Sequence, residues 1–375
     1  MRRRLSTDDA VFASGMHQQH TCMPQRGTLM AEAVTGRRLG WRWWNGVLSP
    51  QAFRSLLGLL VAAIFGAVLL SRTDLAQMVS SMRDVRVPLL VVAGLLRLTG
   101  LVVLSFRWHM LIRHIGSPGA PRLIPALAIG HMGNTVLPFS LGGVLRAHYM
   151  QTRYGIAATS SLSSIVLENL IDAVVLAGFF IPALAILGVG SRLAWTMLAI
   201  GGVGAGVLVL MRVLLSGRSL GCRRVLALPR TVVPKPLATR LASCREEAQA
   251  GLRSVRSTRT LAIAVLLTVA ARLVTVGVHW LVGLAFGLDL DWTSYLVVTA
   301  AANASGFVAL SQGNVGPYEI ITAEVVAGLG AARGTATAYA IVAHAVLLVP
   351  IVAAGLAFLG WHLAMGPRRR PLPAG

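Results

Sequence analysis

Six long apolar runs limit what this chain can fold into, because each approaches or exceeds the roughly 20 residues that an α-helix needs to cross a bilayer. The chain is 55% hydrophobic and 13% charged, whereas soluble domains hold about 25% charged residues. We therefore expect an all-α polytopic membrane protein with about six full spans. The runs cover Phe53–Leu70, Pro88–Ile112, Leu162–Leu187, Leu193–Met211, Leu261–Phe286 and Ala338–Leu363.

The net charge of +21 is carried mainly by the connections between these runs. Basic residues crowd the head of the chain, the connection 212–259 and the tail. Basic loops stay in the cytoplasm and face anionic lipid. The pattern predicts a plasma (inner) membrane protein with both termini cytoplasmic and no nucleic-acid partner.

The same pattern predicts the domain organisation. Residues 1–46 are polar, basic and aperiodic, and we expect them to be disordered. Residues 47–365 form a single transmembrane domain, in which a first repeat (88–211) and a second repeat (260–363) flank the cytoplasmic connection 212–259. Residues 366–375 form a basic cytoplasmic tail.

A broken apolar stretch between the second and third long runs predicts a re-entrant hairpin. The topology puts Arg122 and Arg153 on one side of the membrane, so the chain between them must enter and leave by one face. Residues 123–136 would form an arm of about 21 Å, too short for a core of about 30 Å. Pro138 ends this arm, and Gly142 with Gly143 allows the reversal.

A second broken stretch, residues 303–330, predicts a similar hairpin that enters from the opposite face. An offset of 171 residues aligns Ser140 with Ser311, Gly142 with Gly313 and Val144 with Val315. Opposed broken helices of this kind form inverted repeats that enclose a substrate site near the midplane. The alternative is two unrelated glycine-rich kinks, since glycine and proline are common in membrane helices.

Ionisable residues within membrane segments mark functional sites or closed ion-pair sets. Arg146 follows the first break, Glu168 and Asp172 share a helix face in the third run, and Glu319 and Glu324 follow the second break. On the functional interpretation, Arg146 and the backbone donors at the glycine pair bind an anionic head group, while the carboxylates hold the arginine or bind a coupling cation. On the structural interpretation, the same charges only pin the hairpin.

Other polar residues in the runs are weaker candidates. Arg97 and Arg272 either snorkel to the interface or pair with the carboxylates, and Arg107 with Trp108 is typical of an interfacial anchor. Two single histidines, at positions 279 and 344, are expected to be packed and neutral. No catalytic motif or metal-ligand spacing is present, so we expect a protein that is not an enzyme and has no metal or cofactor.

Three motifs resemble those of a flippase-like membrane family typified by the transmembrane region of lysylphosphatidylglycerol synthases, over roughly residues 50–365. The first motif is matched by Asn134, Leu137, Pro138, Gly142 and Arg146; the second by Glu168 and Asp172; the third by Ser311, Gly313, Gly316 and Glu319.

Departures from these motifs reduce the number of charges. Ser140 and Gly143 replace the Arg and Glu common in the first motif, Asn169 replaces Arg in the second, and Ala309 and Asn314 replace Pro and Gly in the third. The fold assignment is unaffected, but fewer charges remain to recognise a head group. The expected head-group site comprises Asn134, Pro138, Gly142, Gly143, Arg146, Glu168, Asp172, Ser311, Gly313, Asn314, Gly316 and Glu319.

The resemblance implies roles in moving aminoacylated phosphatidylglycerol between leaflets or in assembling lipid-linked sugars. We expect a membrane protein that binds and translocates an anionic phospholipid or a polyprenyl-phosphate-linked glycan intermediate, with envelope-biogenesis enzymes as partners. Two alternatives stay open: a membrane-embedded lipid-phosphate transferase, and a non-transporting scaffold subunit of an envelope-assembly complex.

Overall fold

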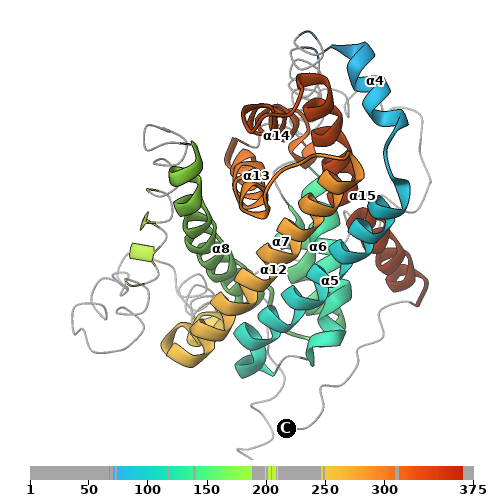
Figure 1. Cartoon of the computed structure of the whole chain (residues 1–375). Helices are drawn as coiled ribbons and strands as arrows, with labels where there is room; N and C mark the ends of the chain where they lie inside the picture. Colours follow the sequence, from blue (N-terminus) through green and yellow to red (C-terminus); the bar gives the residue numbers. More distant parts are fainter. Residues whose placement is uncertain are drawn as a thin grey trace, which may run out of the picture.

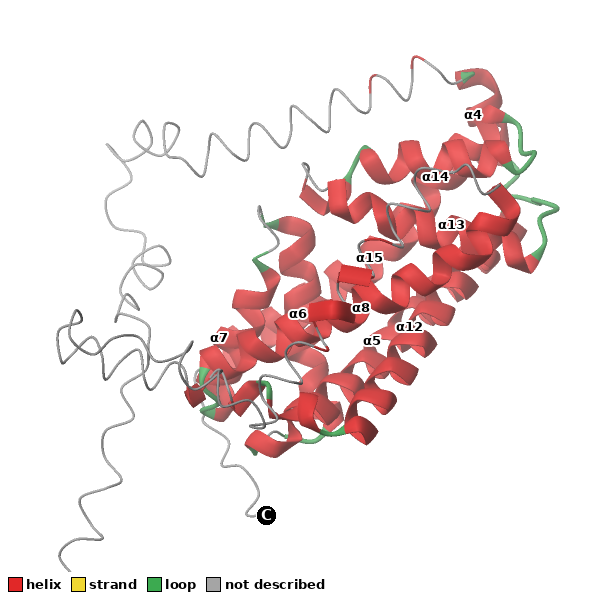
Figure 2. Cartoon of the chain, turned by 90° about the vertical axis from the view of Figure 1, so that its left-hand side faces the viewer, coloured by secondary structure: helices red, strands yellow, loops and turns green. Residues whose placement is uncertain are grey.

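The structure is a computed structural model of the 375-residue chain, drawn in Figure 1. It describes residues 74–116, 118–137, 141–187, 250–308 and 312–365, with isolated positions at 67, 71, 199, 202, 203, 205–207, 209, 246 and 247. Within these residues every regular element is helical (Figure 2). The all-α prediction is therefore confirmed for this part of the chain.

Among the described residues, four long helices are apolar and long enough to cross a membrane. They are α5 (Val87–Ile112), α8 (Ala158–Leu187), α12 (Thr258–Ala285) and α15 (Arg333–Met365). Each coincides with one of the apolar runs in the sequence. In the other two predicted spans, only position 67 of Phe53–Leu70 and seven isolated positions of Leu193–Met211 are described, so the number six stays a prediction.

The helices α5 and α12 pack side by side along most of their length (Figures 1 and 2). α5 begins with a proline in its first turn, where the missing N–H costs nothing. α12 is capped at its N-terminus by Ser257, whose hydroxyl accepts a hydrogen bond from the backbone N–H of Thr260 at 3.2 Å. Gly100 faces Val274 at their contact, and a methyl group there would meet that side chain at 3.5 Å. This pair of helices carries the arginines Arg97 and Arg107 on α5 and Arg272 on α12.

Shorter helices fill the space beside the long ones. They are α4 (Leu75–Arg83), α6 (Ala120–Val136), α7 (Gly142–Tyr154), α13 (Trp292–Ala304) and α14 (Pro317–Gly328). At 1.5 Å per residue α6 is about 26 Å long and α7 about 20 Å, shorter than a hydrocarbon core of about 30 Å. At each of the two interrupted stretches the structure has two helices separated by a break, α6 and α7 at the first and α13 and α14 at the second. That these pairs are re-entrant and related as an inverted repeat stays a prediction.

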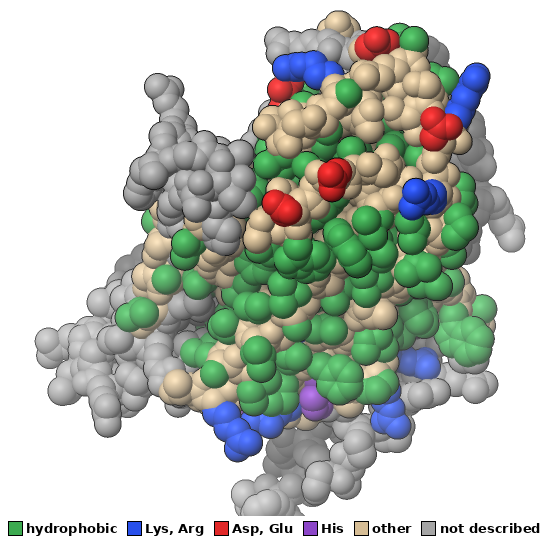
Figure 3. Space-filling model, in the orientation of Figure 1, with side chains coloured by type: hydrophobic (Ala, Val, Ile, Leu, Met, Phe, Trp, Pro, Cys, Tyr) green, Lys and Arg blue, Asp and Glu red, His purple; other side chains and the backbone are tan. Residues whose placement is uncertain are grey.

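An apolar belt of hydrophobic side chains crosses the middle of the visible face of the molecule (Figure 3). Val91 and Leu95 on α5 and Leu266 on α12 are among the large hydrophobic side chains that are more than half exposed. Lys and Arg side chains are visible in both the upper and the lower part of this face, whereas the visible acidic side chains lie in its upper part, so the lower end is the basic end (Figure 3). An apolar belt with charged ends matches the exterior expected of a helical membrane protein.

The first break differs in one respect from the prediction. Gly142 and Gly143 do not make the reversal, because both lie in the first turn of α7 and neither has a positive φ. α6 ends at Val136 and α7 begins at Gly142; Pro138, which we expected to end the first arm, lies outside the described residues. Gly142 is needed for close approach: a Cβ atom there would overlap the carbonyl oxygen of Gly130 on α6.

The two neighbouring glycines therefore give a matched pair of variants. Gly142→Ala is expected to lower the free energy of unfolding by about 1–3 kcal/mol, because the added methyl group forces α6 and α7 apart. In Gly143→Ala the new methyl group would lie 3.7 Å from the side chain of Ile165, an ordinary contact, and little change is expected. Thermal melting of the two purified variants in one detergent checks this; equal melting temperatures would show that the close approach does not matter.

Candidate functional site

A polar cavity of about 480 Å³ lies in the centre of the bundle. Residues of α5, α6, α7, α8, α12, α13, α14 and α15 and of the second break line it. Among the described residues that line it are four arginines but only two carboxylates: Arg97, Arg107, Arg146 and Arg272 against Glu168 and Asp172. A cavity with excess positive charge inside a membrane protein is suited to an anionic ligand.

One end of the cavity is closed by a buried ion-pair cluster. The guanidinium of Arg107 on α5 donates to Glu168 Oε1 at 2.5 Å and to Asp172 Oδ1 at 2.6 Å, both on α8. Arg146 on α7 donates to Glu168 Oε2 at 2.8 Å, and the hydroxyl of Thr268 on α12 accepts from Arg107 at 3.0 Å. Side chains from four helices thus share one cluster, and Glu168 lies at its centre.

Arg146 has a different position from the one expected of a ligand-binding residue. It is only 5% exposed, it is paired with Glu168, and its guanidinium carbon lies 4.0 Å above the ring of Trp108. Both the carboxylate and the aromatic face stabilise the charge. The structural interpretation therefore describes Arg146 better, although one side of the residue still lines the cavity.

The interfacial-anchor interpretation of Arg107 and Trp108 is wrong. The two side chains are 1% and 0% exposed, and the indole N–H of Trp108 donates to the hydroxyl of Ser164 at 3.1 Å. Arg107 is the main partner of the carboxylates on α8. One signal in the sequence could have indicated this pairing, because two carboxylates one helical turn apart in an apolar run need a cation from another helix.

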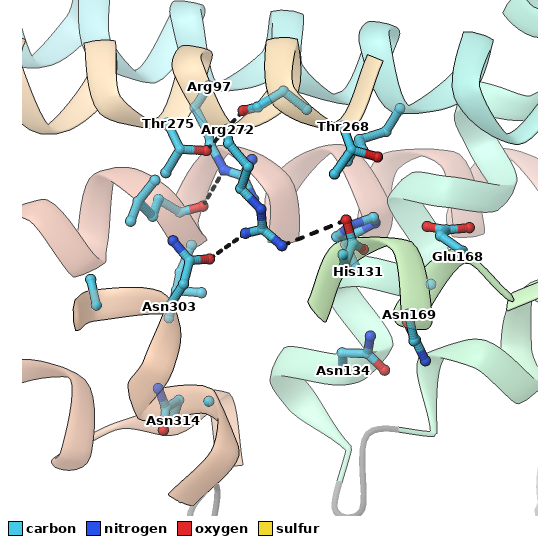
Figure 4. A pocket seen from close by; sticks show the side chains of 18 of the residues that line it. Arg97, His131, Asn134, Glu168, Asn169, Thr268, Arg272, Thr275, Asn303 and Asn314 are labelled. Atoms are coloured by element: carbon cyan, nitrogen blue, oxygen red, sulfur yellow. Dashed lines mark hydrogen bonds and ion pairs between the residues drawn. The ribbon is translucent and has the colours of Figure 1, made fainter. Parts of the chain in front are cut away.

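The other end of the cavity carries Arg97 from α5 and Arg272 from α12, which lie beside one another in Figure 4. Arg272 hydrogen-bonds to the side-chain oxygen of Asn303 and lies 3.6 Å from Asp172. The Nε of Arg97 donates to the backbone carbonyl of Leu347 at 3.3 Å, and no described carboxylate lies within 4.0 Å of its guanidinium. These two arginines hold the excess positive charge.

The two chain breaks contribute amides and backbone to the cavity. The side chain of Asn134 at the end of α6 accepts from the Gly142 N–H at 2.8 Å, so this backbone donor is not free for a ligand. Gly313 and Asn314 have φ values of 63° and 62°, and Gly316 has 99°, which is the left-handed turn that the second break needs. Asn134, Gly143, Gly313 and Asn314 all line the cavity; Ser311 lies outside the described residues.

Glu319 belongs to a separate buried cluster. Its carboxylate accepts from the Gly316 N–H at 2.6 Å, at the start of α14, and lies 2.6 Å from Nδ1 of His344 on α15. The ring of His344 stacks on Tyr318, whose hydroxyl lies 2.9 Å from Nε2 of His279. The histidines are packed as expected, but they are also part of this hydrogen-bonded chain.

The structure thus brings the predicted residues into two groups. Glu168 pairs with Arg146, and Asp172 contacts Arg107 and Arg272 instead, while Glu319 contacts neither arginine of the first group. Glu324 is exposed and pairs with Arg333 at 3.1 Å, so it takes no part in the cavity. Sequence reasoning undervalued the arginines of α5 and α12, whose packing against each other was not predictable from either helix alone.

Comparison with known proteins finds a family and a curated relative that are similar to this chain. The family described as "Lysylphosphatidylglycerol synthase TM region" matches residues 55–355. A protein named "Glycosyltransferase AglD" from Haloferax volcanii is 27% identical over 340 residues, which cover 81% of this chain and 54% of that protein. The chain therefore spans about half the length of this curated relative.

These comparisons correct one expectation. The sequence motifs led us to expect that the protein is not an enzyme, but the relative is named a glycosyltransferase and the family is named after a synthase. Both names point towards an enzyme-like function, which a search for soluble catalytic motifs could not detect. The match extends over most of the chain, including the whole of α5, α8 and α12 and the larger part of α15, and we conclude that this membrane protein belongs to the lysylphosphatidylglycerol synthase TM region family.

Proposed function

We propose that the central cavity binds the phosphate-bearing head group of a membrane lipid, either an anionic phospholipid or a polyprenyl-phosphate-linked glycan intermediate. The observation that carries this proposal is the pair Arg97 and Arg272, two guanidinium groups side by side on the cavity wall. No described carboxylate lies within 4.0 Å of Arg97, and Arg272 lies 3.6 Å from Asp172, a carboxylate that it shares with Arg107. Guanidinium forks match phosphate oxygens in geometry and charge. We place the basic end of the bundle in the cytoplasm of the plasma membrane.

In this proposal the two ends of the cavity have different tasks. The cluster of Arg107, Arg146, Glu168 and Asp172 keeps α5, α7 and α8 in register, because removing any one charge leaves its partners buried and uncompensated. Arg97 and Arg272 bind the phosphate. Two amides of the second interrupted stretch, Asn303 and Asn314, line the same space and are suited to hydroxyl groups of a sugar or glycerol.

Translocation of the bound lipid is the version of this function that we favour. Irregular backbone at membrane depth is tolerated where it lines a cavity, and Gly313 in the second break and Asn134 near the end of α6, just before the first break, line this one. If the breaks open alternately, a head group held between them gains access to either leaflet.

A lipid-phosphate transferase is the second candidate, and the name of the Haloferax relative favours it. The same two arginines would then hold the lipid phosphate as a reactant. Glu168 and Asp172 are the carboxylates that line the cavity, and Asp172 has the more exposed side chain of the two, at 26%. It is therefore the carboxylate that a substrate reaches first.

Lipid capture by the purified full-length protein tests the proposal. We compare wild type, Arg272→Gln and the exposed control Arg333→Gln. Each protein is incubated with a polyprenyl phosphate or with the matching polyprenol, and the bound lipid is identified and quantified by native mass spectrometry. Wild type and the control should retain the phosphate in preference to the alcohol, and Arg272→Gln should lower phosphate retention about tenfold, because a hydrogen bond to a charged group is lost.

The recovered lipid also separates the two candidates. Binding or translocation returns the lipid with its mass unchanged, whereas a transferase supplied with its donor returns a lipid of higher mass. Equal retention of the phosphate and the alcohol by wild type would contradict both candidates, since both need the phosphate to be recognised.

A further inference from the structure

Three histidines are among the described residues that line the central cavity. They are His131 on α6, His279 on α12 and His344 on α15. Imidazole changes its charge between about pH 5 and 8, so each of these rings is a candidate for taking up a proton when an anion enters. The proposed function uses none of them. Their hydrogen bonds decide which of them can hold the proton.

The surroundings of His344 favour a protonated ring. Its Nδ1 lies 2.6 Å from Oε1 of Glu319. An ionised carboxylate only accepts hydrogen bonds, so Nδ1 carries the hydrogen atom of the neutral ring and Nε2 holds the lone pair. His344 is 6% exposed and lines the cavity, and no described group hydrogen-bonds to its Nε2. His344 and Glu319 thus form a dyad, in which a proton added at Nε2 is stabilised by the carboxylate behind the ring.

The other two histidines have no carboxylate partner among the described residues. Nδ1 of His131 lies 2.8 Å from the backbone carbonyl of Leu127. His279 has partners on both ring nitrogens, and the hydroxyl of Tyr318 lies 2.9 Å from its Nε2. A neutral carbonyl or hydroxyl compensates a full positive charge less than a carboxylate does. Of the three rings, the one in the dyad is therefore best suited to hold a proton.

The dyad lies near one of the two arginines assigned to the lipid phosphate. Arg97 donates from its Nε to the backbone carbonyl of Leu347 at 3.3 Å. His344 precedes Leu347 by three residues on α15, and residues at this spacing lie on the same face of a helix. All three residues line the cavity. A phosphate held by Arg97 therefore lies on the side of the cavity that carries His344, and its negative charge favours the protonated ring.

The helices packed against α15 place further titratable groups around the dyad. Arg97 and Arg272 are positive charges that oppose protonation while the cavity is empty. The neutral titratable groups of the cavity wall are His131, His279 and Tyr318. The other charged residues of the described wall belong to the ion-pair cluster at the opposite end, namely Arg107, Arg146, Glu168 and Asp172. The α4 side chains that hydrogen-bond to α15, Gln77 and Ser81, carry no charge. An entering anion offsets the repulsion from the two arginines, so anion and proton favour each other.

We propose that the dyad of His344 and Glu319 binds one proton when an anionic head group enters the central cavity and releases it when the head group leaves. This inference rests on the proposed function and adds the proton as its coupling ion. The proton comes from water and bonds to Nε2 of His344, which then donates to a phosphate oxygen, while Nδ1–H keeps its hydrogen bond to Glu319. In the translocation version of the function, one proton crosses the membrane with each lipid.

Proton uptake is measured by isothermal titration calorimetry of the purified full-length protein in detergent, in buffers that differ in their heat of ionisation. The titration is repeated between about pH 5 and 8, the range in which imidazole changes charge. The probes are two phosphodiesters, a short-chain phosphatidylglycerol and the methyl ester of a polyprenyl phosphate. Each carries one fixed negative charge near neutral pH, so the lipid itself contributes no proton.

Two variants change the dyad in different ways. His344→Gln removes the titrating ring. In Glu319→Gln the amide oxygen can still accept from the Gly316 N–H, the bond that Glu319 makes at 2.6 Å, while the amide NH₂ donates to Nδ1 and keeps the ring neutral. His131→Gln is the matched control, because it removes a histidine of the same cavity that faces a backbone carbonyl. Arg272→Gln tests the proposed function itself.

Wild type should take up close to one proton for each bound lipid. Its affinity should rise up to about tenfold for each unit by which the pH falls, because proton and lipid binding are linked. His344→Gln and Glu319→Gln should each abolish the uptake and flatten this pH dependence, whereas His131→Gln should keep both.

The outcomes separate this inference from the proposed function. If wild type binds the phosphodiesters through Arg272 but takes up no proton, or if His344→Gln retains the uptake, the dyad is not the proton site and the proposed function stands. Loss of the uptake in His131→Gln alone would place the proton on that histidine instead. If Arg272→Gln binds both probes as wild type does, the proposed function fails and this inference fails with it.

Discussion

Replacing Glu168 by glutamine is expected to lower the free energy of unfolding by about 3–5 kcal/mol, the usual cost of breaking a buried ion pair. Glu168 is 4% exposed and accepts hydrogen bonds from both Arg107 and Arg146. The amide keeps the size of the side chain but removes the charge, so two guanidinium groups lose their shared carboxylate. A denaturant titration of the purified protein in mild detergent measures the change.

Glu324→Gln is the matched control for this prediction. The substitution is chemically the same, but the pair of Glu324 with Arg333 is exposed, with side chains 50% and 61% accessible. Exposed pairs contribute about 0–1 kcal/mol, so the midpoint should barely move. If both variants lost the same stability, the buried cluster would not be what holds α5, α7 and α8 together.

Replacing both Arg97 and Arg272 by glutamine is expected to weaken the binding of a phosphate-bearing lipid about 100-fold. Each arginine contributes a charged hydrogen bond of about 1.5 kcal/mol or more, and two such losses correspond to about two powers of ten. The fold should survive, because like charges that lie beside one another in the cavity are removed and Asp172 keeps its pair with Arg107 at 2.6 Å.

The control for this double variant removes the same total charge elsewhere. Arg113 and Arg333 are both exposed and do not line the central cavity, so Arg113→Gln with Arg333→Gln should bind the lipid as wild type does. Affinity is measured by titrating the lipid against the purified proteins in matched nanodiscs. A loss of similar size in the control would mean that overall charge, and not the cavity, attracts the lipid.

Much of the architecture was predictable because the membrane imposes it. Long apolar runs must be helical, since backbone polar groups in lipid have no other partners, and α5, α8, α12 and α15 appear where the runs are. The break at Gly313 was also visible in the sequence, since a left-handed turn favours glycine. The role of Gly142 was not, because its need for close approach comes from Gly130 on a different helix.

The candidate site was only partly predictable for the same reason. Glu168 and Asp172 lie one turn apart, so their shared face follows from helix geometry alone, and the structure confirms it through their common partner Arg107. Which cation pairs with the two carboxylates depends on how α5 packs against α8. No local sequence pattern holds information on that packing. Arg107 therefore looked like an anchor, and Arg146 was assigned to a ligand although its charge is already compensated.

The binding of a lipid phosphate in the central cavity is tested most directly by an electron cryo-microscopy structure of the full-length protein in nanodiscs made with its native lipids. We expect density for a phosphate within hydrogen-bonding distance of the guanidinium groups of Arg97 and Arg272, with the lipid chains leaving the cavity towards the membrane. A cavity that holds only water or acyl chain would contradict phosphate binding by these two arginines. In that case Arg97 would still donate to the carbonyl of Leu347, and Arg272 would still donate to the side chain of Asn303.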